Sequence, residues 1–335
     1  MGGQSEVQSQ EITWDVAGIA VSATLTLPTT TGSHPAVAFV AGSGPTDRDW
    51  NSPLIPGSNG SARLLAQDLA HSGFISVRYD KRASGPHAKE NVPRLAGTIS
   101  LQSHVDEFAG AVAAVAARQD VEADHIYALT NSEGAIHALN YQRQAEGQLL
   151  AGFVLTGMPG RSIADTMRSQ VIPQLSALPD GTEMINHYQE AIADFLARRP
   201  VHLDPSLPDA LKMVFASLTN PANLPFAREL MSVNPAELMC QITQPILVVI
   251  GKKDIQVNWQ TDGRLLERAV AERDNVSFAY PDNANHVLKY EPKPRDELAP
   301  AEVQATYNAE GRVLDRDALA TIQRWLAGQA ESIQQ

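Results

Sequence analysis

The chain has 335 residues, which suits one large α/β domain with an insertion or two domains. Hydrophobic residues make up 43% and charged residues 19%, as in ordinary globular proteins. The formal net charge of −12 repels phosphate backbones and anionic membrane surfaces, so we expect no nucleic-acid partner. No apolar run reaches the roughly 18 residues that a membrane span needs, so no span is predicted.

The compartment is predicted from the N-terminus and from the one cysteine. Cys240 cannot form an internal disulfide, and its surroundings favour a buried structural thiol over a nucleophile. The N-terminal "MGGQSEVQSQEITW" has neither a basic start nor an apolar core, so we predict no signal peptide. We expect a cytoplasmic monomer or homodimer, with a leader already removed as the alternative.

Apolar strands and amphipathic helices alternate along most of the chain. Residues 11–28 alternate as two strands around a turn near Asp15–Gly18. Further strands are predicted at 34–42, 73–80, 124–132, 149–157, 244–254 and 276–286. Helices are predicted at 59–72, 100–119, 133–144, 259–273 and 315–329. This order predicts an α/β fold with a mostly parallel central sheet and helices on both faces, and a site at the edge where the strands end.

The alternation stops over residues 158–244, where no convincing strand occurs. Helical stretches at 162–178, 182–199, 208–218 and 226–233 are separated by proline-rich joints. We predict a helical cap inserted into a core made of 1–157 and 245–335. Six of the seven methionines lie in it and either line an adaptable apolar pocket or fill the insertion's own core: Met158, Met167, Met184, Met213, Met231 and Met239.

The stretch "ALTNSEGA" places Ser132 between the strand at 124–132 and the helix that follows. A serine on such a tight turn can be an exposed nucleophile, and small flanking residues relieve the crowding of the turn. Gly134 fits this requirement, whereas Thr130, two residues before the serine, fits less well. The alternative is that Ser132 simply caps the helix.

Two further loops carry the partners that a nucleophilic serine requires. Asp254 closes an apolar strand and can orient an imidazole, although a turn aspartate is the plain alternative. His286 follows the last strand, where a structural histidine is also common. Together with Ser132 they favour a catalytic triad, because all three residues follow strand ends. Asp262, Asp274 and Asp282 are weaker candidates for the acid.

The glycine-rich "AGSGPTDRDWN" supplies a possible oxyanion site. Gly42 permits close backbone approach, and the backbone N–H of Ser43 is predicted as one donor to a developing oxyanion. The N–H of Glu133 is predicted as the second donor. A phosphate loop is the alternative, but the lysine of a P-loop is missing and two aspartates follow.

Two arginines each have two alternative roles. Arg48 and Arg82 either brace the site loops through Asp47, Asp49 or Asp80, or bind a substrate carboxylate. The Glu133 side chain has a plain role as well, because an acid is favourable at a helix N-terminus.

Five motifs together resemble those of bacterial α/β-hydrolase serine esterases with an H-G-S-G-P-x-D-R type loop. The motifs are "AGSGPTDRDWN", "GFISVRYDKR", "NSEGA", "GKKDIQV" and "NANH". These esterases are related to the prolyl-oligopeptidase-like and dienelactone-hydrolase-like groups, and the resemblance covers roughly Glu11 to Gly328. The chain order Ser, Asp, His is the one expected of α/β hydrolases. The resemblance implies a Ser132–His286–Asp254 triad, no metal or cofactor, and a small carboxylic ester as substrate, often with a short acyl chain.

The sequence departs from that family twice. Its elbow is T-N-S-E-G rather than G-H-S-x-G, and Ala41 stands where the oxyanion loop usually has histidine. An amidase, peptidase or thioesterase with the same triad is an alternative. A non-catalytic protein that binds a small ligand on a hydrolase fold is another.

Overall fold

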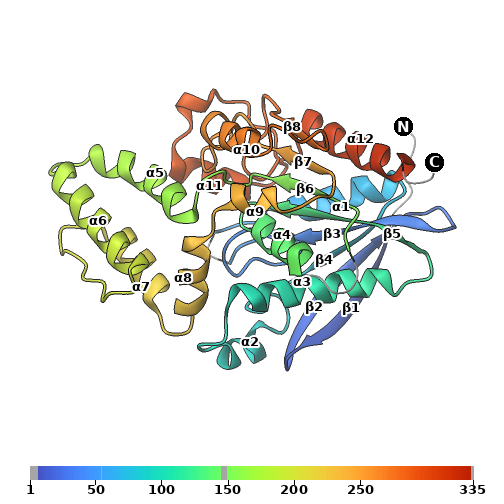
Figure 1. Cartoon of the computed structure of the whole chain (residues 1–335), viewed down its shortest axis with the longest axis horizontal. Helices are drawn as coiled ribbons and strands as arrows, with labels where there is room; N and C mark the ends of the chain where they lie inside the picture. Colours follow the sequence, from blue (N-terminus) through green and yellow to red (C-terminus); the bar gives the residue numbers. More distant parts are fainter. Residues whose placement is uncertain (1–6, 54, 145–148, 333–335) are drawn as a thin grey trace.

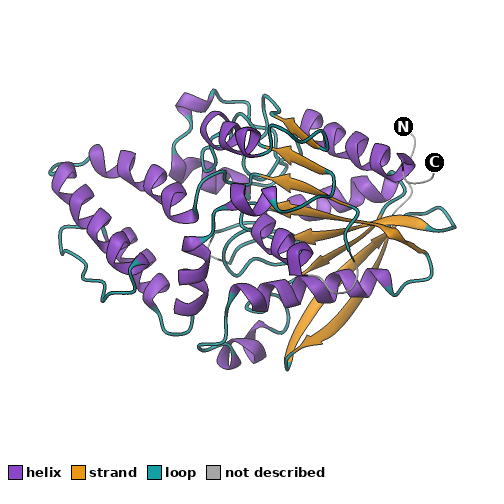
Figure 2. Ribbon diagram, viewed as in Figure 1, coloured by secondary structure: helices purple, strands orange, loops and turns teal. Residues whose placement is uncertain are grey.

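The computed structural model describes residues 7–53, 55–144 and 149–332, so residues 1–6 of the N-terminal stretch lie outside it. Its strands form one twisted sheet, drawn in orange in Figure 2, in the order β1-β2-β4-β3-β5-β6-β7-β8. The strands are β1 (Gln8–Val16), β2 (Ile19–Leu27), β3 (His34–Val40), β4 (Ile75–Tyr79), β5 (Val121–Asn131), β6 (Gly152–Thr156), β7 (Ile246–Val249) and β8 (Val276–Ala279). Every strand predicted from the sequence is present.

The sheet is mostly parallel, as predicted. β1 and β2 form an antiparallel hairpin through Ala17 and Gly18, whose φ angles of 52° and 82° suit a tight turn. β2 also pairs antiparallel with β4, and all remaining neighbours run parallel. The carboxyl ends of β3 to β8 therefore meet at one edge of the sheet.

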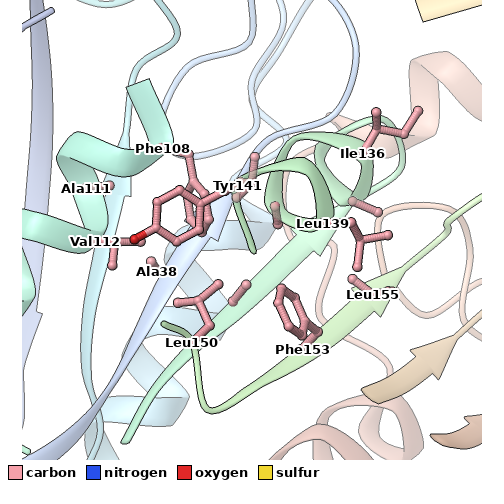
Figure 3. Close-up of a cluster of buried hydrophobic side chains, with 14 of the residues drawn as sticks. Ala38, Phe108, Ala111, Val112, Ile136, Leu139, Tyr141, Leu150, Phe153 and Leu155 are labelled. Carbon is pink, nitrogen blue, oxygen red and sulfur yellow. The ribbon is translucent and has the colours of Figure 1, made fainter. Parts of the chain in front are cut away.

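Helices cover both faces of the sheet. They are α1 (Ser61–His71), α2 (Ala88–Asn91), α3 (Leu101–Ala116), α4 (Gly134–Gln144), α5 (Ile163–Ser176), α6 (Gly181–Leu196), α7 (Asp209–Thr219), α8 (Leu224–Ser232), α9 (Pro235–Cys240), α10 (Arg264–Ala269), α11 (Pro300–Tyr307) and α12 (Arg316–Ser332). Figure 3 shows the core on one face, where Phe108 of α3 and Ile136 of α4 pack with strand residues such as Phe153. On the other face, Leu65 of α1 and Ile322 of α12 are fully buried.

The helices α5 to α8 extend away from the sheet, at the left of Figure 1. They follow β6 in the chain and have a hydrophobic cluster of their own around Tyr188, Phe195 and Phe215. Leu230 of α8 also reaches the main core beneath the sheet, as do Leu238 and Met239 of the next helix, α9. The stretch 158–244 thus contains four projecting helices and one helix that packs on the core.

Two local expectations need correction. The helix expected at 259–273 begins with a π-helical turn, Trp259–Gly263, and α10 ends at Ala269. Cys240 is exposed rather than buried, and its Sγ contacts the carbonyl of Ala269 at 2.9 Å.

Candidate active site

Ser132 lies on a sharp turn between β5 and α4, and its φ of 52° places it in the left-handed region. That conformation is costly for a residue other than glycine and is typical of functional sites. The Ser132 N–H donates to the carbonyl of Thr156 at 2.8 Å, which holds the turn against β6. No hydrogen bond joins the Ser132 hydroxyl to any described residue in the structure, so Ser132 does not cap α4.

The residues flanking the turn explain how an unusual elbow sequence fits. A Cβ on Gly134 would lie 2.6 Å from the carbonyl oxygen of Val40, so only glycine lets α4 approach β3 this closely. Thr130 instead lies inside β5, fully buried and paired with Val40 and Leu155. A β-branched residue suits that strand position, so the threonine does not crowd the turn itself.

Asp254 and His286 form a buried pair. His286 Nδ1 lies 2.7 Å from Asp254 Oδ2. Asp254 is 0% exposed and His286 is 5% exposed. The other carboxylate oxygen, Oδ1, accepts hydrogen bonds from the N–H groups of Gln256 and Val257 at 2.7 and 2.9 Å. These bonds fix the carboxylate, and His286 Nε2 has no hydrogen-bond partner among the described residues.

The histidine loop and the serine turn are joined through their neighbours. Asn131 Nδ2 donates to the carbonyl of His286 at 3.0 Å. A Cβ on Gly157 would lie 3.0 Å from His286 Cε1, so the end of β6 passes directly against the imidazole. Both segments that flank His286 therefore also hold Ser132. The structure contains no hydrogen bond between Ser132 and His286 themselves; such bonds often form only when substrate is bound.

The glycine-rich loop after β3 lies against the same turn. A Cβ on Gly42 would lie 3.0 Å from Asn131 Oδ1 and 3.4 Å from Ser132 Cβ, so this approach requires glycine. The N–H groups of Ser43 and Glu133 donate to no other group in the part of the chain that the structure describes. The two predicted donors therefore flank Ser132 and are free to bind a ligand.

The two arginines have different partners. Arg48 pairs with Asp80 at 2.7 Å and donates its backbone N–H to the same carboxylate at 2.9 Å, which braces the loop as one of the two hypotheses expects. Arg82 pairs instead with Glu107 of α3 and also donates to the carbonyl of Ser103. Its partner is thus none of the three aspartates named from the sequence.

A buried ionic network beside Ser132 was not predicted from the sequence. Lys81 Nζ lies 3.0 Å from Glu133 Oε1, and His137 Nε2 lies 3.1 Å from the same oxygen. Burial alone would raise the pKa of Glu133, but the charge of Lys81 and the hydrogen bond from His137 hold it well below the usual value. Burial lowers the pKa of His137 to about 4, despite the hydrogen bond with Glu133. His104 packs on His137 with ring centres 4.9 Å apart.

A cavity of about 540 Å³ lies between the projecting helices and the two predicted oxyanion donors, Ser43 and Glu133; its lining includes neither Ser132 nor His286. Ser43, Lys81 and Glu133 line its polar side. Its apolar side is formed mainly by residues of α5, α7 and α8, namely Ile163, Met167, Leu218, Phe226, Ala227, Leu230 and Met231.

Three of the six methionines of the insertion take one of the two expected roles, and the other three take neither. Met167 and Met231 line the cavity. Met158 and Met239 are buried in the main core, Met184 packs in the cluster of the projecting helices, and Met213 is exposed. The pocket explanation thus applies to two of them.

Neither a metal cluster nor a membrane span occurs among the described residues. Over 7–53, 55–144 and 149–332, no group of three or more His, Cys, Asp or Glu side chains is arranged to hold a metal ion. No helix in those ranges is both long and apolar enough to cross a bilayer.

Comparison with known proteins supports the fold. No family model matches the chain. The chain is similar to esterase EstD of Thermotoga maritima, with 26% identity over 305 residues, which is 90% of this chain and 64% of that protein. This chain therefore spans less than two thirds of that relative's length.

Solved structures agree on the fold at low identity. The α/β hydrolase GrgF from Penicillium sp. sh18 superposes with a TM-score of 0.53 at 14% identity, covering 83% of this chain and 91% of that one. The esterase domain of a Rhodothermus marinus protein superposes with a TM-score of 0.50 at 15% identity, covering 95% and 98%. The chain has the fold that these proteins share.

Proposed function

We propose that this chain, whose fold is that of the α/β hydrolases, is a serine carboxylesterase that hydrolyses small carboxylic esters. The observation that carries the proposal is the buried pair of His286 and Asp254, 2.7 Å apart, at the strand edge where Ser132 lies on a left-handed turn. The similarity to an esterase over 90% of the chain agrees with this assignment.

The first half of the reaction forms an acyl-enzyme. His286 Nδ1–H donates to Asp254, which leaves Nε2 unprotonated and able to act as a base. Ser132 Oγ attacks the ester carbonyl carbon while its proton passes to Nε2. The carbonyl oxygen becomes an oxyanion and accepts hydrogen bonds from the Ser43 and Glu133 N–H groups. The tetrahedral intermediate collapses, the C–O bond to the alcohol breaks, and the alcohol leaves with the proton from His286.

The second half releases the acid. Water gives a proton to His286 Nε2 and adds to the acyl carbon, and the oxyanion forms again at the same donors. The bond to Ser132 Oγ then breaks, and the serine recovers its proton from His286. Asp254 stabilises the imidazolium in both halves without taking up a proton.

The cavity indicates which substrates fit. Its wall from α5, α7 and α8 is apolar, so the group that enters it is an uncharged acyl or alcohol chain. Lys81 and Arg82 also reach the cavity, but Glu133 and Glu107 pair with them. We therefore expect no preference for an anionic substrate, and we assign the arginines to bracing rather than to a substrate carboxylate.

The test is hydrolysis of p-nitrophenyl esters from acetate to decanoate by the native chain and by Ser132→Ala. We expect turnover of the shorter esters by the native chain, none above background by Ser132→Ala, and the same thermal stability for both. Ser72→Ala, at the exposed end of α1, is a matched control that should keep full activity. Reaction of an alkyl phosphonate with Ser132 should accompany the activity, because only an activated serine is phosphonylated.

The proposal fails if Ser132→Ala retains the activity of the native chain. It also fails if the native chain neither hydrolyses any ester nor reacts with the phosphonate, in which case the ligand-binding alternative takes its place. A matching p-nitroanilide distinguishes an esterase from an amidase, since an esterase should turn it over far more slowly.

A further inference from the structure

Lys81 is a buried cation that the proposed reaction does not use directly. It follows β4 and is 3% exposed. Its ammonium group contacts two segments on either side of Ser132: Nζ donates to the carbonyl oxygen of Gly42 at 2.6 Å and pairs with Glu133 Oε1 at 3.0 Å. The contact with Gly42 is as short as strong, charge-assisted hydrogen bonds are, and the contact with Glu133 has an ordinary hydrogen-bond length.

The contact with Gly42 has a geometric consequence for Ser43. The Gly42 carbonyl and the Ser43 N–H belong to the same planar trans peptide group, so they point in opposite directions. Holding the carbonyl on Lys81 therefore sets the direction in which the N–H points. The positive charge also polarises the peptide, which strengthens the N–H as a donor.

We propose that Lys81 is a positioning residue that sets the oxyanion hole, by anchoring the Gly42–Ser43 peptide through its carbonyl and the turn at Glu133 through its carboxylate. The inference rests on the esterase function proposed above. One ammonium group then reaches both segments that supply a donor N–H: Ser43 through the carbonyl of its own peptide, and Glu133 through its own side chain.

The charge of Lys81 matters as well as its length. A negative carboxylate so close to the donors would oppose the developing oxyanion unless a cation compensated it. Lys81 supplies that charge, because the lowered pKa of His137 leaves its imidazole neutral, so that it gives Glu133 a hydrogen bond but no positive charge. Buried ion pairs are weak contributors to stability, because their desolvation offsets their attraction. A role at the site accounts for the pair better than stability does.

The test compares Lys81→Met with the native chain on a short p-nitrophenyl ester. We expect kcat to fall by roughly 10²- to 10³-fold, the range for loss of one oxyanion donor, with KM changed by less than about threefold. The inhibition constant of an alkyl boronic acid, whose tetrahedral adduct places an oxygen at the donors, should rise by a similar factor. Ile322→Ala, on the opposite face of the sheet, is the stability control: it should unfold earlier but keep kcat.

A double variant separates positioning from charge burial. The double variant Lys81→Met with Glu133→Gln removes both charges of the buried pair, so neither is left unpaired. We expect it to fold even if Lys81→Met alone does not. We expect its kcat to stay at least about tenfold below that of Glu133→Gln alone, because the Gly42 carbonyl has lost its anchor.

The inference is overturned if the double variant matches Glu133→Gln in kcat and boronate affinity, or if Lys81→Met loses only thermal stability. Either result leaves the esterase proposal standing, because that proposal depends on Ser132→Ala and on phosphonate labelling of the native chain.

Discussion

Replacing His137 with glutamine should remove a pH dependence from the free energy of unfolding. His137 is fully buried, and burial lowers its pKa to about 4 from an ordinary value of 6.5. Glu133 opposes this change, whereas the nearby charges of His104 and Lys81 add to it. Glutamine can keep the hydrogen bond to Glu133 but does not titrate in this range.

The sign and size follow from the two pKa values. Because the folded state holds the proton less tightly, the unfolded chain binds more protons between pH 6.5 and pH 4, so stability falls as the pH falls. A tenfold difference in proton affinity corresponds to about 1.4 kcal/mol, so a pKa lowered from 6.5 to about 4 gives a loss of about 3 kcal/mol by pH 4. Above pH 7 this contribution is constant.

The assay is urea unfolding of the native chain and of His137→Gln at several pH values from about 7.5 to 4. Groups such as Glu133 titrate in both proteins, so the difference between their free energies of unfolding isolates His137. The native chain should lose about 3 kcal/mol relative to the variant over this range. Parallel curves at all pH values would show that His137 titrates alike in both states and would refute the reasoning.

Three further changes test the site. Gly42→Ala places a methyl group 3.0 Å from Asn131 Oδ1 and should move the Ser43 N–H away from the oxyanion position. We therefore expect kcat to fall by about 10²-fold, with the fold intact by circular dichroism. An unchanged kcat would contradict the close approach of Gly42 to the Ser132 turn. Asp254→Asn should lower kcat by roughly 10⁴-fold at neutral pH, as expected when the imidazole loses its orienting carboxylate, and a loss below about tenfold would point to another acid. Met231→Trp should fill part of the cavity and lower kcat/KM for the octanoate ester by about tenfold or more while sparing the acetate ester, since each buried methylene contributes about 0.8 kcal/mol. Equal losses on both esters would show that the acyl chain binds outside this cavity.

The sheet could be predicted because its strands are short apolar runs separated by amphipathic helices. The candidate triad followed from the same pattern, since Ser132, Asp254 and His286 each come after a strand that the sequence makes evident. Parallel pairing brings such positions to one edge whatever the details of packing.

The network around Lys81 could not be predicted in the same way. Lys81 stands in a polar segment after β4, and its contact with Gly42 depends on how the loops of two neighbouring strands bend. His137 lies four residues after Glu133, a spacing that does place them on one side of a helix. However, only the packing of α3 and α4 decides that this side faces the interior. The exposure of Cys240 likewise depends on packing, because it is set by how the end of α9 lies against α10.

The route of the chain from β6 to β7 bears on how this protein can change. β6 and β7 are parallel neighbours, so they need a crossover connection, and the six-residue α9 is the core-packed helix of that connection that directly precedes β7. The four helices before it have a hydrophobic cluster of their own and touch the main core chiefly through α8, whose Leu230 belongs to that core. We therefore expect residues 162–233 to tolerate exchange as a unit if the contacts of α8 with the main core are kept. Substituting a shorter or longer helical segment there would remodel the apolar wall of the pocket while leaving the register of the sheet and the position of Ser132 unchanged.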